Sequence, residues 1–304
     1  MTVLHGDCRE VLQTMPDNCV DAIITDPPYE LGFMGKSWDS TGVAYDIKVW
    51  QECLRVLKPG GHLLAFGGSR TYHRLACAIE DAGFQIRDQI MWVYGSGFPK
   101  SLNIGKAIDK IQENQRVPTG TFTNQPSKGG HHAGNTGRGV KSTERYITEI
   151  DQGFSVWEGW GTALKPAHEP IVVAYKPAEE DFVDKTNCSL TRFFYCAKAS
   201  SSERNAGLKD MPKKKADLRT DVAAGMWKDK NAAHQNHHPT VKPVNLMRDL
   251  IKLVTPLDGI VLDPFLGSGT TAVAAINENI NWIGFEMNPE YATIATRRVE
   301  HASF

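Results

Sequence analysis

Short apolar runs alternate with amphipathic segments near the start of the chain. Val20–Thr25, His62–Phe66 and Gln85–Tyr94 have the pattern of buried strands, whereas Ile47–Leu57 and Arg70–Ala82 have helical spacing. Prolines and glycines follow several of these segments and are expected to end them. Strands that alternate with helices predict a mostly parallel sheet with helices on both faces.

The last sixty residues repeat this alternation. Val244–Val254, Gly267–Ile276 and Pro289–Val299 are predicted helices, and Gly259–Asp263 and Asn281–Glu286 are predicted strands. The two α/β parts together predict a Rossmann-like fold.

Polar sequence fills most of the middle of the chain. Thr119–Thr143 and Ala199–His237 are rich in polar and small residues, and a strand-like island, Glu169–Tyr175, stands between them. Long polar insertions in a compact α/β domain are uncommon unless they are functional or disordered. Solvated loops without a function remain the alternative for both.

Charge and cysteine usage exclude several classes of protein. The net charge of −1 argues against a purely electrostatic nucleic-acid binder, so a nucleic-acid partner would need a local basic patch. The six cysteines form no Cys-x-x-Cys pair, and the histidines lack cysteines at ligand spacing, so we expect no zinc or other metal. The start of the chain has no secretory pattern and no apolar run reaches about 18 residues. We therefore expect a cytoplasmic protein without a membrane partner.

The tetrapeptide Asp26-Pro27-Pro28-Tyr29 directly follows a predicted buried strand. An exocyclic amine on a nucleobase is a poor nucleophile, so a site that alkylates it needs acceptors aimed at its N–H groups. The Asp26 carboxylate and the Pro27 carbonyl can supply two acceptors, and Tyr29 can stack on a base that has left the duplex. A strand-ending turn with a buried tyrosine is the structural alternative.

A glycine-rich turn follows the predicted strand that ends at Asp263. Such a turn lets the backbone approach a ligand closely, and Glu286 at the end of the next strand has the spacing of a carboxylate that binds ribose hydroxyls. The turn has no Gly-Lys-Ser/Thr, which argues against a phosphate loop. The two motifs together favour a nucleoside cofactor beside an amine site, and S-adenosylmethionine meets both requirements. A carboxylate at a helix N-terminus is the alternative for Glu286.

With these motifs in this order, the chain resembles the amino-methyltransferases of bacterial and phage restriction-modification systems, in their circularly permuted β group. The resemblance rests on Asp26–Tyr29 ahead of Asp263–Thr271, and on His5-Gly6-Asp7, Leu57–Gly61, Gly97–Ser101, Leu164–Ile171, Phe194–Ala199 and His238–Pro243. It implies a seven-stranded S-adenosylmethionine-dependent methyltransferase sheet with one antiparallel strand. Glu169–Tyr175 is the candidate for that strand, beside Gln85–Tyr94.

The resemblance also implies a domain organisation. We expect a catalytic part at 1–111, a target-recognition insertion at 112–165, a return to the sheet at 166–198, a second polar insertion at 199–237, and a cofactor part at 238–304. The candidate catalytic residues are Asp26, Pro27, Pro28 and Tyr29. The candidate cofactor residues are Asp7, His238, Thr240, Lys242, Asp263, Phe265, Gly267, Ser268, Gly269, Thr270, Thr271 and Glu286.

Double-stranded DNA is the expected partner, and the two polar insertions are expected to read it. The candidate phosphate contacts are Lys128, Arg138, Lys141, Arg145, Lys213, Lys214 and Lys215. Members of this group often dimerise, and a cognate restriction endonuclease belongs to many such systems. A homodimer and a partner endonuclease therefore remain open.

The expected reaction is methylation of N6 of adenine, because Asp at the first motif position leans toward adenine in this family. Methylation of cytosine N4 uses the same geometry and is the first alternative. Methylation of a protein glutamine or an RNA base is less expected, since those relatives usually carry Asn at that position. Cytosine C5 chemistry is excluded because the chain has no Pro-Cys dipeptide. An inactive cofactor- or DNA-binding module is the alternative outside enzymes.

Overall fold

The computed structural model describes residues 1–32, 37–95, 102–123, 147–153, 155–162, 167–178, 193–215 and 233–303. The chain forms two compact units. The larger unit consists of Met1–Gly97, Pro166–Leu218 and Asn231–Phe304, and the smaller one of Phe98–Lys165 and Arg219–Lys230.

The larger unit is built on a mixed sheet with eight strands in the described residues, in the order β1-β12-β11-β2-β3-β7-β4-β8. The strands are β1 (Thr2–His5), β2 (Val20–Thr25), β3 (Leu57–Phe66), β4 (Gln85–Val93), β7 (His168–Tyr175), β8 (Phe193–Tyr195), β11 (Ile260–Asp263) and β12 (Asn281–Glu286). Strand β7 runs antiparallel to both β3 and β4, and the other pairings are parallel. The predicted antiparallel strand beside Gln85–Tyr94 is thereby confirmed. The sheet has one strand more than expected, because the short β8 pairs with the edge of β4.

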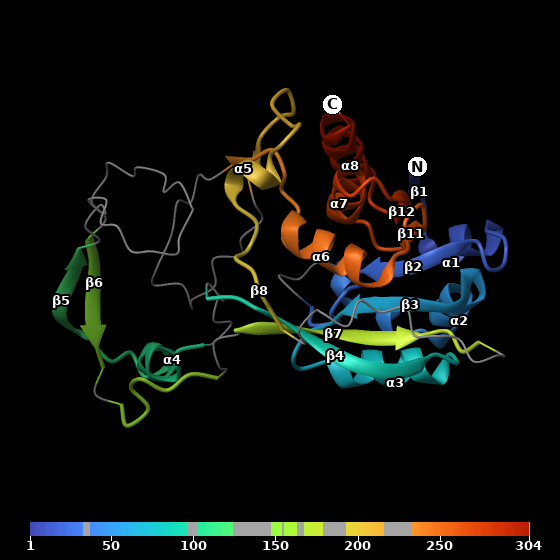
Figure 1. Cartoon of the computed structure of the whole chain (residues 1–304). Coiled ribbons are helices and arrows are strands. Elements are labelled where there is room, and N and C mark those ends of the chain that lie inside the picture. Colours follow the sequence, from blue (N-terminus) through green and yellow to red (C-terminus); the bar gives the residue numbers. More distant parts are fainter. Residues whose placement is uncertain are drawn as a thin grey trace. The chain divides into compact units, whose positions relative to one another are not determined.

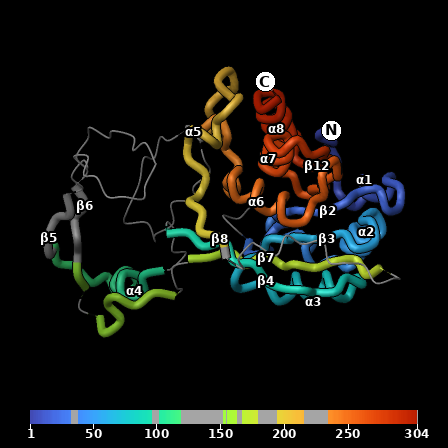
Figure 2. Tube along the Cα trace, in the orientation of Figure 1, coloured from blue at the N-terminus to red at the C-terminus, as the bar shows by residue number. Residues whose placement is uncertain are grey.

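Helices cover both faces of the sheet (Figure 1). One core contains α1 (Cys8–Val11), α2 (Ile47–Val56) and α3 (Tyr72–Asp81), and the opposite core contains α6 (Val244–Val254), α7 (Thr270–Asn277) and α8 (Pro289–Ala302). Figure 2 shows the blue N-terminal segment beside the red C-terminal one, as expected from the parallel pairing of β1 with β12. The doubly covered α/β fold predicted from the alternating pattern is confirmed.

The start of β3 differs from the prediction. Lys58-Pro59-Gly60-Gly61 was expected to be a turn that ends a helix, but β3 begins at Leu57 and includes all four residues. Gly60 has a φ of +74°, and the register of β2 against β3 shifts between Val20 and Ala22. A left-handed glycine therefore lets the strand bulge where the sequence pattern indicates a break.

The central strands β2 and β11 lie side by side, with Leu262 opposite Ile23. From β2 the chain continues to β3 on one side, and from β11 it continues to β12 on the other. The connections therefore diverge at the carboxyl ends of β2 and β11. In open α/β sheets this switch point is where ligands bind, and both sequence motifs begin there.

The smaller unit contains α4 (Ile104–Ile111) and the antiparallel pair β5 (Val117–Thr123) and β6 (Ile147–Gln152). Helix α4 belongs to this unit, whereas the boundary predicted at residue 111 placed the helix in the catalytic part. Arg116 explains the grouping, because it pairs with the buried Asp109 of α4 and with Glu158. None of the described helices is long and apolar enough to cross a bilayer.

Candidate active site

The turn after β2 is held by a buried aspartate. Asp39 accepts hydrogen bonds at Oδ1 from the backbone N–H groups of Tyr29 (2.8 Å) and Glu30 (3.1 Å), and at Oδ2 from that of Leu31 (3.2 Å). Its side chain is 1% exposed. Since the prolines before Tyr29 already restrict the backbone, the turn places Asp26 and Tyr29 in a defined relation.

The carboxylate of Asp26 is only half satisfied. Oδ2 pairs with the Lys242 ammonium, whereas the buried Oδ1 has no hydrogen-bond partner among the described residues. Burial raises the pKa of Asp26, and the nearby Lys242 opposes that rise. An unpaired buried carboxylate oxygen costs free energy unless a ligand donor meets it, so Oδ1 is an acceptor available to a substrate N–H.

Tyr29 belongs to a network with a second carboxylate. Its hydroxyl donates to Glu169 Oε2 (2.7 Å), and the ammonium groups of Lys242 and Lys198 lie 3.5 and 3.7 Å from the Glu169 oxygens. Burial alone would raise the pKa of Glu169, but the two lysines hold it below its usual value. The network therefore contains two carboxylates and two ammonium groups.

Aromatic rings form the walls of this site. The Lys242 ammonium lies 5.3 Å from the ring centre of Tyr29, 4.9 Å from that of Phe66 and 5.9 Å from that of Trp92. Trp92 in turn packs on Tyr94 at 4.9 Å. Aromatic faces attract cations and stack on planar rings. The site is therefore suited both to a flat base and to positive charge that develops on it.

Asp263 connects the glycine-rich turn to the catalytic strand. Its Oδ1 accepts from Thr25 Oγ1 (2.6 Å) and from the Phe265 N–H (3.0 Å), and its Oδ2 accepts from Thr271 Oγ1 (2.5 Å). Burial raises its pKa to about 6. The two predicted motifs are thus joined directly, with Asp263 at the base of the turn.

Glu286 lies at the other side of the same turn. Its oxygens accept from the Gly267 N–H (2.8 Å) and the Asn288 N–H (2.7 Å), and burial raises its pKa to about 7. Strand β1 places His5 opposite Glu286, so Asp7 follows at the same sheet edge. Asp7 caps α1 and pairs with Arg9 at 2.5 Å. Asp7 and Glu286, which were both predicted to bind the cofactor, therefore lie at the same edge of the sheet.

Gly267 has a φ of +55°, and a Cβ there would lie 3.0 Å from His238 Nε2. The His238 ring stacks on Trp38 at 6.4 Å and meets Tyr291 edge-on at 4.5 Å. Burial, with nearby cations, lowers the pKa of His238 to about 3, so its ring is neutral. The backbone N–H of Thr240 lies 3.4 Å from His238 Nδ1. His238 thus lies at the glycine-rich turn with Thr240 beside it, whereas the Lys242 ammonium lies at Asp26, and the contacts of these residues with the cofactor remain predictions.

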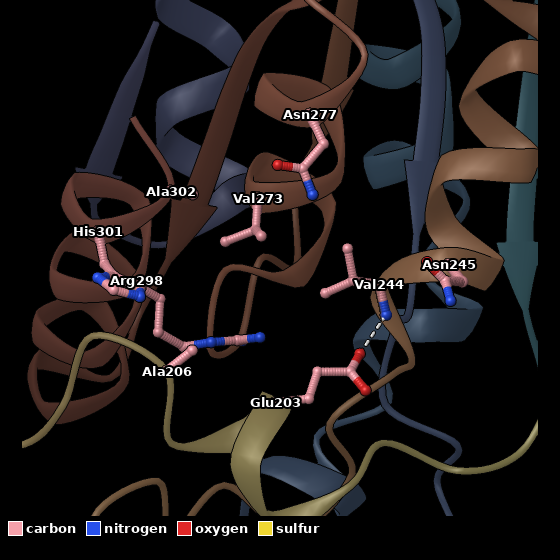
Figure 3. A pocket seen from close by; sticks show the side chains of 9 residues that line it. All are labelled: Glu203, Ala206, Val244, Asn245, Val273, Asn277, Arg298, His301 and Ala302. Carbon is pink, nitrogen blue, oxygen red and sulfur yellow. Dashed lines mark hydrogen bonds between the residues drawn. The ribbon is translucent and has the colours of Figure 1, made fainter. Parts of the chain in front are cut away.

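The rest of the turn is supported from α8. Arg298 is 2% exposed, and its Nη1 donates to the Ser268 carbonyl (2.6 Å) and lies 3.1 and 3.2 Å from the Ser268 and Thr270 hydroxyls. Gly269 precedes α7 with a φ of +83°. Arg298 also lines a cavity of about 270 Å³, where Glu203 accepts from the Val244 N–H at 2.6 Å (Figure 3). This cavity is distinct from the cluster around Asp26.

The turn between Asp263 and Glu286 fits S-adenosylmethionine. Asp263 is buried and Glu286 is half-buried, and neither forms an ion pair with any residue that the structure describes. A ligand with a positive sulfonium supplies the opposite charge, and its two ribose hydroxyls can add donors to those that the carboxylates already have. The positive φ of Gly267 and the absence of its side chain keep the backbone accessible beside them.

The predicted DNA contacts are placed only in part. Lys213 is exposed, and Lys214 pairs with Glu290 at 2.6 Å. Lys128, Arg138, Lys141 and Arg145 lie outside the described residues, as does the side chain of Lys215. In the smaller unit Trp157 and Trp160 are 46% and 60% exposed and pack edge-to-face at 5.8 Å. The DNA-binding roles remain predictions.

The sheet order, the two motifs at its switch point and the paired carboxylates define an S-adenosylmethionine-dependent methyltransferase. The chain belongs to the DNA methylase family N6_N4_Mtase, whose model matches residues 20–297. It is therefore an enzyme that methylates an exocyclic amine of adenine or cytosine in DNA.

Two relatives come from Haemophilus influenzae. The type II methyltransferase M.HindIII is 27% identical over 277 residues, which cover 83% of this chain and 68% of the relative. The type II methyltransferase M.HinfI is 23% identical over 317 residues, which cover 98% of this chain and 68% of the relative.

Two solved structures show the same fold. The M1.HpyAVI–SAM complex has a TM-score of 0.52 and 21% identity, with 98% of each chain covered. The PvuII DNA methyltransferase, described as cytosine-N4-specific, has a TM-score of 0.58 and 17% identity, with 98% of this chain and 85% of that chain covered. The predicted methyltransferase fold is confirmed.

Several residues at the site were not predicted from the sequence. Asp39 and Arg298 had been assigned no role, and Glu169 and Lys198 were named only as parts of a strand or of segments that resemble the family. One signal was present for Glu169, since an acidic residue at the edge of an otherwise apolar strand indicates a buried polar partner. The role of Asp39 depends on a backbone turn that no sequence pattern predicts.

Proposed function

We propose that this enzyme transfers a methyl group from S-adenosylmethionine to N6 of adenine in double-stranded DNA, at a base that has left the duplex. The observation that carries the proposal is the unpaired, buried Oδ1 of Asp26 beside the aromatic rings of Tyr29, Phe66 and Trp92. That oxygen can accept an amine N–H while the base stacks on Tyr29. Asp at the first motif position favours adenine over cytosine.

The residues of the chain bind and orient the base. Asp26 Oδ1 and the Pro27 carbonyl accept the two N–H groups, so the nitrogen lone pair points away from the ring plane. The bound cofactor supplies an electrophilic methyl group on a positive sulfur. As the N–C bond forms and the S–C bond breaks, positive charge on the nitrogen is stabilised by Asp26, Glu169 and the aromatic faces. The Asp26 carboxylate, which already accepts one N–H, then takes that proton and passes it to water, so the methylated amine and the departing S-adenosylhomocysteine are both left without the sulfonium charge.

The hydrogen-bonded ends of β2 and β11 support direct transfer of the methyl group from the cofactor to the base. Thr25 and Asp263 are hydrogen-bonded side by side, so the amine acceptor and the cofactor turn begin on adjacent residues of neighbouring strands. Such proximity removes most of the entropic barrier to reaction between two bound groups. A covalent enzyme intermediate is unnecessary for this geometry.

DNA recognition is assigned to the polar insertions at 112–165 and 199–237. In the described part of the first insertion, exposed Trp157 and Trp160 provide ring faces that can stack on bases. The turn that carries them is held by the Arg116–Glu158 pair at 2.6 Å. Because both sequence relatives are named type II methyltransferases, we further propose that this enzyme is site-specific and belongs to a restriction-modification system.

Nucleoside mass spectrometry tests the reaction. Purified protein is incubated with unmethylated genomic DNA and S-adenosylmethionine, with RNA and protein substrates run in parallel. N6-methyladenine in the DNA is expected with the parent and is absent with Asp26→Ala. N4-methylcytosine would overturn the base assignment but keep the family's chemistry. Modification at the parent rate by Asp26→Ala would overturn the mechanism.

A further inference from the structure

The Lys242 ammonium lies next to the place proposed for the substrate amine, at the other oxygen of the Asp26 carboxylate. It pairs with Asp26 Oδ2 and lies among the rings of Tyr29, Phe66 and Trp92, where the base would stack. The residue is 5% exposed. A resident cation therefore holds one oxygen of Asp26, while Oδ1 has no hydrogen-bond partner among the described residues.

A second carboxylate lies within reach of the same ammonium. Lys242 Nζ is 3.5 Å from Glu169 Oε2, so one ammonium pairs with both carboxylates at the same time. Glu169 comes from β7 and Asp26 follows β2, so the lysine bridges two strands that are not neighbours in the sheet. This bridge holds the Asp26 carboxylate through Oδ2 and leaves Oδ1 for the base.

The backbone of Lys242 is restricted as well. Pro243 follows it directly and precedes α6, and a residue before proline is restricted to extended conformations. The side chain is therefore anchored at its Cα by the backbone and at its ammonium by two carboxylates.

We propose that Lys242 is a positioning residue of the methyltransferase reaction, which keeps Asp26 ionised and holds its carboxylate through Oδ2 in a bridge to Glu169, so that Oδ1 is left to meet the substrate amine. This proposal rests on the proposed function and assigns to Lys242 a place at the amine rather than at the methionine end of the cofactor. The paired charges on Asp26 and Lys242 keep the acceptor in the state that the amine needs.

The titratable groups around Lys242 determine how the pH dependence of activity changes when Lys242 is replaced. They are Asp26, Tyr29, Glu169, Lys198 and His238, and burial keeps the last of these neutral. Loss of Lys242 removes the nearby positive charge and leaves burial and the negative charge of Glu169, both of which raise the pKa of Asp26. The low-pH limb of the activity profile, where Asp26 must be ionised, then moves to higher pH.

The test compares Lys242→Gln with Lys242→Arg and with the surface control Lys252→Gln. Single-turnover methylation is measured from pH 5.5 to 9, and the Asp26 carboxyl is titrated by ¹³C NMR in the free protein. For Lys242→Gln we expect a rate lower by about 10- to 100-fold at neutral pH, with recovery as the pH rises, and both titrations displaced upward by about 1–3 pH units. Lys242→Arg should keep a profile close to the parent, and Lys252→Gln should match it.

Three outcomes would overturn the proposal. A parent-like pH profile and Asp26 titration in Lys242→Gln would show that Lys242 does not act on Asp26. Loss of S-adenosylmethionine affinity in Lys242→Gln, measured by calorimetry, would return the residue to the cofactor site. An Asp26 titration that moves in Lys242→Arg as far as in Lys242→Gln would exclude a charge effect. If the parent itself methylates no adenine, the proposed function is wrong. The NMR titration of Asp26 in the parent and in Lys242→Gln then still shows whether Lys242 acts on the Asp26 carboxyl.

Discussion

The hydroxyl of Thr25 donates to Asp263 Oδ1 over 2.6 Å, although 238 residues separate the two along the chain. Thr25 ends β2 and Asp263 ends β11, so this bond joins the strand that carries the catalytic turn to the strand that carries the cofactor turn. A buried hydroxyl that meets a buried carboxylate stabilises both groups, and the relative position of the two turns depends on it.

Replacement of Thr25 by valine keeps the shape of the side chain and removes the donor. Asp263 then keeps the Thr271 hydroxyl and the Phe265 N–H, but its carboxylate is less well solvated. We expect the free energy of unfolding to fall by about 1–3 kcal/mol and S-adenosylmethionine to bind more weakly. Thermal melts and calorimetry measure the two effects. Thr293→Val on the exposed side of α8 is the control, and an equal loss there would contradict the assigned role of the Thr25–Asp263 bond.

The partial burial of Glu286 predicts that the stability of the protein depends on pH. Folding raises its pKa from 4.5 to about 7, so the folded protein binds this proton more tightly than the unfolded chain does. The stabilising contribution is therefore complete below about pH 4.5 and is lost as the pH rises through 7. Denaturant melts without cofactor should show that Glu286→Gln flattens the pH dependence of unfolding between pH 5 and 8. A slope identical to that of the parent would show that Glu286 is not titrating in this range.

Gly269 combines a left-handed backbone with a close neighbour. A Cβ there would lie 3.0 Å from the Cα of Ala295 on α8, whereas Gly42 has a similar φ of +75° and open space around it. Both alanine substitutions incur a backbone cost of about 1–2 kcal/mol. Gly269→Ala should cost about 1–3 kcal/mol more than Gly42→Ala, because α7 and α8 must separate. Equal losses in urea unfolding would show that the contact is unimportant.

Asp39 should affect catalysis through the turn that carries Tyr29. In Asp39→Asn the side chain retains one acceptor oxygen for the three backbone N–H groups that Asp39 holds. We expect a lower methylation rate with an S-adenosylmethionine affinity within about twofold of the parent, since the cofactor turn lies on another strand. Asp249→Asn on the exposed face of α6 serves as control. A parallel loss of cofactor affinity would indicate general unfolding instead.

The elements nearest the site were predicted well because each carries its own pattern. Val20–Thr25 and Asn281–Glu286 are short apolar strands with clear ends, and their bounds agree with the structure. The β-bulge at Gly60 was missed because Pro-Gly-Gly also ends helices. Local sequence does not distinguish the two outcomes, since the pairing of β3 with β7 decides between them.

The active-site network was harder to predict because its members meet only through the sheet. The antiparallel register of β7 places Glu169 opposite Trp92 and thereby within reach of Tyr29. Lys242 was predicted from its motif to bind the cofactor, and the structure places its ammonium beside Asp26 and Glu169. Spacing along the chain shows which residues matter, whereas their partners depend on strand order and register.

The pairing of β4 with β7 has a consequence for the diversity of such enzymes. Val93 lies opposite His168, and the Tyr94 N–H donates to the Ala167 carbonyl at 2.9 Å. The chain therefore leaves the catalytic sheet and returns to it at two strand ends that are hydrogen-bonded to each other. A loop closed in this way gains length at little entropic cost, about 0.6 kcal/mol for each doubling. We therefore expect that residues 95–166 can be exchanged for the corresponding segment of a relative while the contacts around Asp26 are kept.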